Sequence, residues 1–317
     1  MKIRTASIAT DAPAIAEIFI QSNAEVTTVD EVCSWMQSSA PGRIAHHQVC
    51  VDEQDAVIGY GHIIHTASSP ANLFYAWIGV NPPYRRRGIG SALWGSLLVD
   101  LQAQGATHVI GDVPEQEPAG LAFARPRGFV IERCQFHSIL DLTAFDETPF
   151  LPTIAALEGQ GIRFCTLADL PDDADTQRKY YELNLAVVRD IPGEFWNFDE
   201  YPQFFKEHIL GAPWFRREGQ ILAVDGDTFA GFASVSLDLE AQSAYNATTG
   251  VARVYRGKAI GLVLKVLAAR YARRRGAQRI FTDNDSLNAP ILAINRKMGY
   301  LSQPGRYKLV LRLGKYE

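Results

Sequence analysis

One stretch of the sequence, WIGVNPPYRRRGIGSALWGSLL at residues 77–98, decides the fold. Its opening residues are typical of a buried strand, and its Arg- and Gly-rich turn leads into a leucine-spaced helix that we expect at residues 89–104. The first N–H groups of a helix have no intrahelical partners, and the helix dipole places positive charge beside them. The stretch therefore predicts a loop that can bind a phosphate group.

The same pattern occurs a second time. TGVARVYRGKAIGLVLKVL, at residues 249–267, matches the first copy and has Arg256 at the position of Arg85. A glycine after each helix, a following strand and a final Gly-aromatic pair repeat at one constant offset, which duplication explains better than chance. We therefore expect two homologous domains, at residues 1–147 and 148–317, joined through a stretch that contains proline and glycine.

Each copy alternates strands with helices, which predicts an α/β fold with a mixed central sheet and helices on both faces. In the first copy we expect strands at residues 48–50, 56–64, 75–80, 108–113 and 130–142, and helices at residues 11–20, at 89–104 and near Leu121. In the second copy we expect strands at residues 221–224, 231–239, 247–251, 279–283 and 307–313, and helices at residues 260–275 and 289–297.

Composition narrows the function. The 317 residues include 31 Lys and Arg against 35 Asp and Glu, a net charge of −4, so no basic field attracts nucleic acid or an anionic membrane. Four scattered cysteines argue against disulfides or a metal site and favour a cytoplasmic location, and no segment is typical of a signal peptide or a membrane span. His62 and His65 should face opposite sides of a strand and share no metal, while His46 and His47 are expected at the edge of a loop.

The two loops do not match other phosphate-binding motifs. Neither contains the GxxxxGK[ST] of a P-loop or the GxGxxG of a dinucleotide-binding turn. Their shared pattern is RxxGxG in the first copy and RxxAxG in the second, and its recurrence favours a phosphate site over a solvated cationic turn. The candidate phosphate-binding residues are Arg85, Arg86, Arg87, Gly88, Ile89, Gly90 and Ser91 in the first copy, and Arg256, Gly257, Lys258, Ala259, Ile260 and Gly261 in the second.

Together with AGLAFARPRGF at residues 119–129 and NAPILAINRKMGY at residues 288–300, these stretches resemble the GCN5-related N-acetyltransferases (GNAT). The opening segments of both copies also look like that family's first strand and helix, so the resemblance covers most of the chain, in a tandem layout. It implies two GNAT-type acyl-CoA N-acyltransferase domains, each with a sheet that opens at its fourth strand to hold acetyl-CoA. The implied reaction is transfer of an acetyl group from acetyl-CoA to an amine, without a metal.

The resemblance also assigns single residues. The backbone N–H groups of Val80 and Val251 would stabilise the oxyanion, and Asn288 would contact the pantetheine arm. The family's usual acid, a Tyr, is replaced by Ala124 in the first copy and by Asn295, a further candidate acetyl-CoA contact, in the second. Because only the second copy keeps the family's Asn, at position 288, we expect the second domain to be catalytic.

The catalytic groups of the second copy stay open at this point. Tyr245, Asp238 and Asn288 are the candidates, and Glu240 and Asp283 are alternatives for the general base. Each of these side chains has an ordinary structural role as its alternative, at a strand end or in a turn.

The acceptor is expected to be the amine of a small molecule. The segment at residues 189–205 is aromatic and acidic, and it either covers an acceptor pocket or packs as an ordinary loop. The carboxylates in it that would suit a cationic amine are Asp190, Glu194, Asp199 and Glu200. Acetylation of a protein or peptide amine, or acyl-CoA binding without catalysis, are the alternatives.

Overall fold

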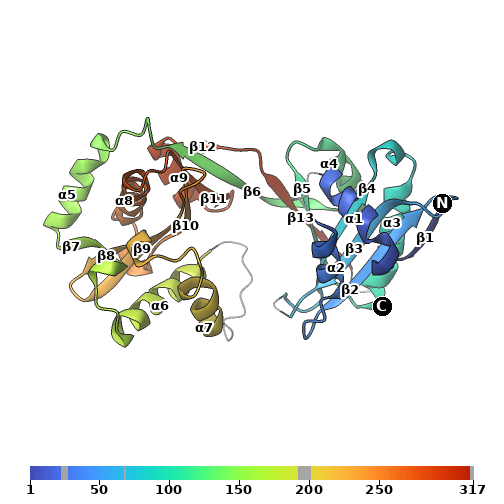
Figure 1. Cartoon of the computed structure of the whole chain (residues 1–317), viewed down its shortest axis with the longest axis horizontal. Coiled ribbons are helices and arrows are strands. Elements are labelled where there is room, and N and C mark those ends of the chain that lie inside the picture. Colours follow the sequence, from blue (N-terminus) through green and yellow to red (C-terminus); the bar gives the residue numbers. More distant parts are fainter. Residues whose placement is uncertain (23–27, 68, 192–200, 315–317) are drawn as a thin grey trace. The chain divides into compact units, whose positions relative to one another are not determined.

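The chain folds into two compact units. The computed structural model describes residues 1–22, 28–67, 69–191 and 201–314. The first unit consists of Met1–Arg133 with Arg306–Glu317, and the second of Cys134–Gly305 (Figure 1). Each unit contains a mixed sheet with helices on both faces, which confirms the predicted fold class.

The sheet of the first unit has the strand order β1-β2-β3-β4-β5-β13. β4 and β5 run parallel, and the other neighbouring pairs run antiparallel. The strands are β1 (Lys2–Thr5), β2 (Ile44–Val51), β3 (Val57–His65), β4 (Leu73–Val80), β5 (His108–Pro114) and β13 (Arg306–Arg312). Helices α1 (Ile8–Gln21) and α2 (Val29–Gln37) pack on one face, and α3 (Ile89–Ala103) and α4 (Pro118–Ala124) pack on the other.

The sheet of the second unit has the corresponding order β7-β8-β9-β10-β11-β6, with β12 (Leu301–Ser302) paired to β6. β10 and β11 are its parallel pair. The strands are β6 (Val130–Asp141), β7 (Ile162–Thr166), β8 (Gln220–Asp225), β9 (Thr228–Asp238), β10 (Ser243–Val251) and β11 (Arg279–Asp285). Helices α5 (Leu151–Gly159), α8 (Ile260–Arg274) and α9 (Ala289–Met298) pack on one face, and α6 (Ala174–Val188) and α7 (Tyr201–Phe204) pack on the other.

Short helical turns connect these elements. Turns of 3-10 helix lie at Pro82–Tyr84, Arg125–Arg127, Thr148–Phe150, Leu167–Asp169, Arg217–Gly219 and Arg253–Tyr255, and a π-helical turn lies at Phe205–Leu210.

The last strand of each sheet comes from the other repeat. β6 ends the first repeat but pairs with β11, whereas β13 ends the second repeat and pairs with β5. The register is equivalent in both sheets, because His137 lies opposite Asp283 and Lys308 lies opposite Asp112. The compact units and the domains at residues 1–147 and 148–317 therefore divide the chain differently, and the domain boundary stays a prediction about the duplication.

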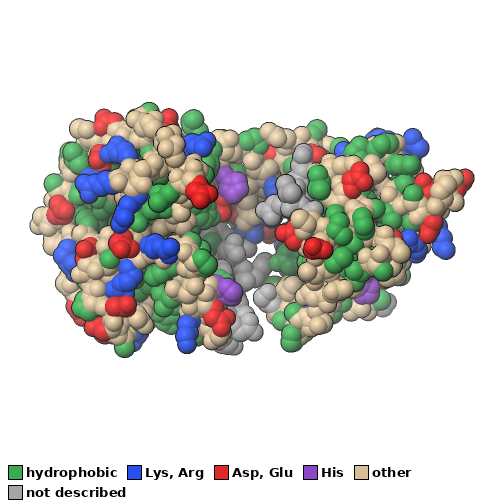
Figure 2. Space-filling view, in the orientation of Figure 1, with side chains coloured by type: hydrophobic (Ala, Val, Ile, Leu, Met, Phe, Trp, Pro, Cys, Tyr) green, Lys and Arg blue, Asp and Glu red, His purple; other side chains and the backbone are tan. Residues whose placement is uncertain are grey.

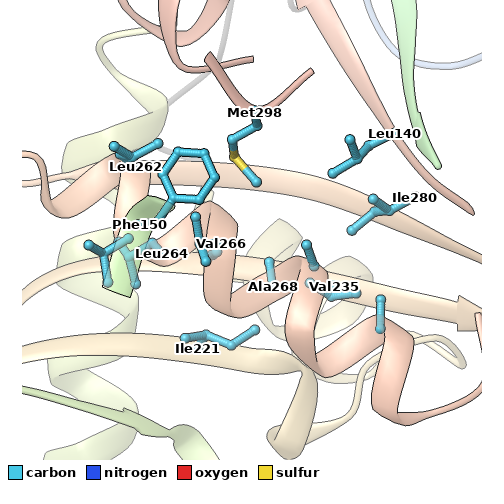
Figure 3. Close-up of a cluster of buried hydrophobic side chains, with 14 of the residues drawn as sticks. Leu140, Phe150, Ile221, Val235, Leu262, Leu264, Val266, Ala268, Ile280 and Met298 are labelled. Atoms are coloured by element: carbon cyan, nitrogen blue, oxygen red, sulfur yellow. The ribbon is translucent and has the colours of Figure 1, made fainter. Parts of the chain in front are cut away.

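The exchanged strands contribute to the core of the unit that they enter. Leu140 of β6 lies in the second core near Ile280 and Met298 (Figure 3). Leu309 and Leu311 of β13 are buried in the first core. Because burial of a leucine side chain stabilises a fold by about 1.5–3 kcal/mol, each unit depends on residues from the other repeat.

The predicted helices and strands around the two loops lie within a few residues of the observed ones, but other features differ, and helix α5 occupies the stretch that was expected to join the two domains. Helix α2 was not expected, although Thr28 and Glu31 form a capping box at its start. His46 and His47 lie within β2, so the prediction that they lie at the edge of a loop is wrong. β2 begins at Ile44, earlier than expected, because its first residues pair with β3. No helix in the described part of the chain is long and apolar enough to cross a membrane.

Candidate functional site

A loop with two left-handed backbone positions precedes α3 and α8. Arg86 (φ 64°) and Gly88 (φ 83°) hold these positions in the first unit, and Gly257 (φ 79°) and Ala259 (φ 63°) hold them in the second. Such alternation turns successive N–H groups toward one side of the loop. The N-cap residue of each helix offers no side-chain hydrogen bond to the first turn. The N–H groups of the first turn are therefore left for an anionic ligand.

An arginine ties each loop to the strand before it. Nε of Arg85 donates to the carbonyl of Val80 at 3.0 Å, and Nε of Arg256 donates to the carbonyl of Val251 at 3.0 Å. The next N–H group along the first strand, that of Asn81, donates to β3. Since backbone groups alternate along a strand, the Val80 N–H is turned away from β3 toward β5. The second unit repeats this pairing, so both valine N–H groups point where an oxyanion donor is expected.

A cavity of about 620 Å³ lies beside the loop of the first unit. β4 and β5 pair from Leu73 to Tyr75 and then separate, and the cavity follows this separation. Trp77 on the α1 face and Trp94 on the α3 face both line it, so it reaches both faces of the sheet. The predicted residues that line it are Val80, Arg85, Arg86, Gly88, Ile89, Gly90, Ser91 and Ala124.

Two further cations lie near this loop. The Arg87 guanidinium does not line the cavity but lies over the Tyr84 ring, 5.5 Å from its centroid. Lys258 has the same relation to a tyrosine ring in the second unit. The Arg127 guanidinium, which the sequence analysis missed, donates to Ser91 Oγ at 2.7 Å and lies over the Phe123 ring. Arg127 therefore adds positive charge at the start of α3.

The arginines of the two loops differ in their partners. Among the described residues, Arg85, Arg86 and Arg87 form no ion pair with a carboxylate, and their charge is available to a ligand. In the second unit Asp190, which follows α6, pairs with both Arg253 and Arg256.

Asp190 thus has a role other than the expected one. The arginine partners, Arg253 first, lower the pKa of Asp190 to about 2. This carboxylate is engaged at the loop, which argues against the expected role in binding a cationic amine. The other carboxylates of that segment, Glu194, Asp199 and Glu200, lie outside the described residues.

The cavity floor of the first unit is apolar, and its counterpart in the second unit is polar. Trp94 and Phe129 form an edge-to-face pair, with ring centroids 5.4 Å apart, in the first unit. Their counterparts are Lys265 and Tyr300, and Asn295 replaces Ala124. These three side chains are buried, and each has a polar atom without a hydrogen-bond partner in the described residues: Lys265 Nζ, Tyr300 Oη and Asn295 Oδ1. Burial lowers the pKa of Lys265 to about 7.

An aromatic cluster fills the α1–α2 face of the first unit. We define this aromatic cluster by its members Phe19, Trp35, His47, Tyr60, His62 and Trp77. The Trp77 ring stacks on Phe19 with centroids 4.4 Å apart. A Cβ added at Gly79 would lie 2.4 Å from the Trp77 ring, so the indole lies against the end of β4. At the Trp77 position the second unit has Thr248.

Two of the candidate catalytic side chains, Asp238 and Asn288, have local structural roles, and a third, Glu240, is exposed. Asp238 ends β9 and accepts the Ala241 N–H at 3.0 Å. Asn288 is the N-cap of α9 and accepts the Ile291 N–H at 3.5 Å. Glu240 is exposed in the turn after β9. These three residues are not brought together with Tyr245.

Tyr245 and Asp283 do come together, and they meet a residue that the sequence analysis missed. Tyr245 Oη donates to Asp283 Oδ2 at 2.5 Å, and His137 Nδ1 pairs with Asp283 Oδ1. Burial, then Asp283, raise the pKa of Tyr245. No sequence signal marks His137, because it lies in the first repeat and reaches Asp283 through the exchanged strand.

Among the described residues, no three His, Cys, Asp or Glu side chains lie close enough to hold a metal ion. Basic and acidic side chains are interspersed over the visible surface of the second unit, at the left of Figure 2.

A parallel strand pair that separates beside an uncapped helix start, present twice, defines a tandem α/β protein with two corresponding loops. The model of the Acetyltransferase (GNAT) family matches residues 15–129 and 185–300, and the chain belongs to this family. It is an N-acetyltransferase with two GNAT domains in tandem, as the sequence predicted.

Several known proteins are similar to this chain. A mycothiol acetyltransferase from Acidothermus cellulolyticus is 25% identical over 264 residues, covering 78% of this chain and 74% of the relative. A streptothricin acetyltransferase from Streptomyces lavendulae is 40% identical over 79 residues, 25% of this chain and 41% of the relative. The structure of a tandem GNAT protein from the clavulanic acid biosynthesis pathway has a TM-score of 0.63 at 20% identity, and the match covers 100% of this chain and 99% of that one.

Proposed function

We propose that the chain transfers an acetyl group from acetyl-CoA to the amine of a small molecule, and that the second unit performs the transfer. The first unit binds acetyl-CoA in its cavity without transferring the group. In both units the loop amides hold the pyrophosphate, and the N–H groups of Val80 and Val251 face the thioester carbonyl.

The fit of acetyl-CoA to the chain rests on the two loops and the cavity. The left-handed positions and uncapped helix starts supply amide donors for the pyrophosphate, and the arginines add charge-assisted donors. The cavity of about 620 Å³ continues from the loop of the first unit through the separated strands, along the path that a pantetheine arm needs.

The position of Trp77 is the observation that supports acetyl transfer by the second unit and not by the first. In a sheet with the CoA loop at one face, the acceptor amine must approach the thioester from the other face. In the first unit the aromatic cluster packs on that face, and the Trp77 ring lies against Gly79 beside the cavity. In the second unit Thr248 occupies the place of Trp77, and the aliphatic side chain of Val187 of α6, in place of an indole, lies against Gly250.

The acceptor class rests on the relatives. The names of two relatives refer to acetylation of mycothiol and of streptothricin, which are small molecules rather than proteins. Transfer to an amine-bearing small molecule is therefore the proposal, with Tyr245 of the second unit close to the reacting amine.

Calorimetric titration with acetyl-CoA tests the binding part of the proposal. Two equivalents are expected for the intact chain. Gly90→Glu and Gly261→Glu each place a carboxylate in a first helical turn beside the pyrophosphate, and each should remove one equivalent. Gly90→Gln and Gly261→Gln are the matched controls, because they add the same bulk without charge. Absence of binding up to millimolar acetyl-CoA would contradict the proposal.

Thiol release from acetyl-CoA tests the transfer part. The acceptors are an amino sugar, a polyamine, a free amino acid and a peptide with a free N-terminus. Turnover is expected with a small amine and not with the peptide. Gly261→Glu should abolish turnover, whereas Gly90→Glu should retain it; the reverse pattern would assign the transfer to the first unit.

A further inference from the structure

Three titratable side chains from three strands meet on one face of the second sheet. Asp283 of β11 binds Tyr245 of β10 through one carboxylate oxygen and His137 of β6 through the other. Ala244 and Ile280 are buried in the core under α8, so alternation along the strands puts Tyr245 and Asp283 on the opposite face. This is the face from which the acceptor approaches in the proposed function.

The three residues lie where β10 and β11 separate. The parallel pairing ends at Tyr245 opposite Phe281, and a bulge follows between Asn246 and Thr248. The Asn246 side chain holds the bulge by donating to the Ser234 carbonyl at 3.0 Å. In the first unit the counterpart of Asp283 is Asp112, and Asp112 lines the cavity between the separated strands.

The first unit has no such bonded cluster among its described residues, although β5 and β13 pair in the same register as β11 and β6. The counterpart of Tyr245 is Tyr75, which lies opposite Ile110 as Tyr245 lies opposite Phe281, and the counterpart of His137 is Lys308, which lies opposite Asp112. The Asp112 carboxylate pairs instead with Arg306. An aspartate is thus present at this place in both units, but only the second unit joins it to a histidine and a tyrosine.

We infer that His137, Asp283 and Tyr245 form the proton relay of the transferase site, with His137 as the general base. This rests on the proposed function, because it concerns the acceptor amine of the same reaction. His137 Nδ1 is bound to the carboxylate, which leaves Nε2 with a lone pair, and the side chain is 67% exposed and open to an acceptor. Asp283 and Tyr245 are positioning residues, since they act through His137.

The proposed step balances as follows. Nε2 of His137 takes one proton from the acceptor ammonium, and the freed lone pair attacks the thioester carbonyl carbon. The new C–N bond forms, the C–S bond breaks, and its electron pair leaves on sulfur. The second proton from the amine nitrogen goes to the thiolate, and His137 returns its proton to water. The exchanged strand thereby makes the site of the second unit dependent on a residue of the first repeat.

The test compares His137→Gln with the intact protein at saturating acetyl-CoA. The acceptor is the best amine of the panel above, or water if no amine is turned over. Thiol release should fall by about 10²–10⁴-fold, with acetyl-CoA affinity by calorimetry unchanged. The acidic limb of the pH–rate profile should disappear. Asp283→Asn should lower kcat and leave the KM for the acceptor unchanged, because His137 loses the carboxylate that orients its ring.

The charged groups around His137 define what the pH profile reports. Asp283 faces it from β11 and Tyr245 faces Asp283 from β10, while Gln135 and Ile139, its same-face neighbours on β6, carry no charge. A kcat of Asp283→Asn equal to that of the wild type would overturn the relay. This variant decides the question even if His137→Gln fails to fold.

A second His–Asp pair provides the matched control. His46 Nδ1 lies 3.5 Å from Asp100 in the first unit, and neither residue lines the cavity, so His46→Gln should leave the rate unchanged. A His137→Gln rate within threefold of the wild type, or a wild-type rate equal to the enzyme-free rate, would overturn the relay. If acetyl-CoA still binds in that case, only the relay is lost. If the wild type binds no acetyl-CoA, the proposed function falls with it.

Discussion

At the scale of single residues, the two loops hold the same backbone shape with different residues. Ala259 occupies a left-handed position that costs an L residue about 1–2 kcal/mol, whereas its counterpart Gly88 occupies it without strain. Ala259→Gly should therefore stabilise the second unit by up to about 1 kcal/mol, since the gain is reduced by the greater chain entropy of unfolded glycine. Urea denaturation measures this change.

Gly88→Ala is the matched reverse change. A Cβ at Gly88 meets no atom within 4 Å, so only the backbone conformation opposes it, and the first unit should lose about 1–2 kcal/mol. Effects of the same sign for the two substitutions would contradict the explanation by strain.

The two histidines of the aromatic cluster, His62 buried and His47 half-buried, lead to a second prediction at this scale. Burial lowers the pKa of His62 to about 3 and that of His47 to about 4, so both are neutral in the folded protein at pH values where an unfolded histidine binds a proton. The free energy of unfolding should therefore fall as the pH drops from 6.5 to about 4, by up to about 1.4 kcal/mol per pH unit for each histidine.

His62→Phe removes one of these titrating groups and keeps an aromatic ring in the cluster. Its unfolding free energy, measured by urea denaturation at pH 7, 6 and 5, should depend on pH more weakly than that of the wild type. If the unfolding free energies of the two proteins depended equally on pH, His62 would bind a proton in the folded protein as readily as in the unfolded chain.

At the scale of elements, the acidic partner of the second loop should weaken its hold on phosphate. Asp190 pairs with Arg253 and Arg256, whereas the loop arginines of the first unit form no such pair in the described chain. Asp190→Asn should tighten acetyl-CoA binding at the second unit by about 1.5–5-fold, because a surface ion pair contributes roughly 0.2–1 kcal/mol. Calorimetry at low salt measures this change, and Asp172→Asn, at an ion pair with Arg217 remote from the loop, is the control. Weaker binding after Asp190→Asn would show that the pair orders the loop for its ligand.

The elements that could be predicted from the sequence are those whose signal is local. The strand, turn and helix around Arg85 and Arg256 follow from periodicity and glycine placement, and the structure has them at the expected residues. Partners that are distant in sequence could not be predicted. Asp190 carries no mark of its pairing with the loop, and nothing near His137 indicates that it meets Asp283.

At the scale of the whole molecule, the exchange of β6 and β13 explains why the duplication was visible and the strand pairing was not. The two strands are homologous and pair in the same register, so either one fits the open edge of β5 or of β11 by local pattern. Whether β6 or β13 pairs with β5 or with β11 depends on how the chain connects the elements in space, and the periodicity of the sequence gives no information about that. A domain boundary drawn from repeats alone therefore assigns both strands to the wrong compact unit.

Because β6 and β13 are exchanged, a core substitution in the last strand of one repeat should destabilise the unit that contains most of the other repeat. Leu311 of β13 and Leu140 of β6 hold equivalent positions and are 8% and 4% exposed in the first and second cores. Leu311→Ala should destabilise the first unit and Leu140→Ala the second, each by about 2–5 kcal/mol. Hydrogen exchange should rise in β5 for the first variant and in β11 for the second. If Leu311→Ala loosened β11 and left β5 protected, each repeat would keep its own last strand, and His137 would then belong to the first unit and leave Asp283 without its base.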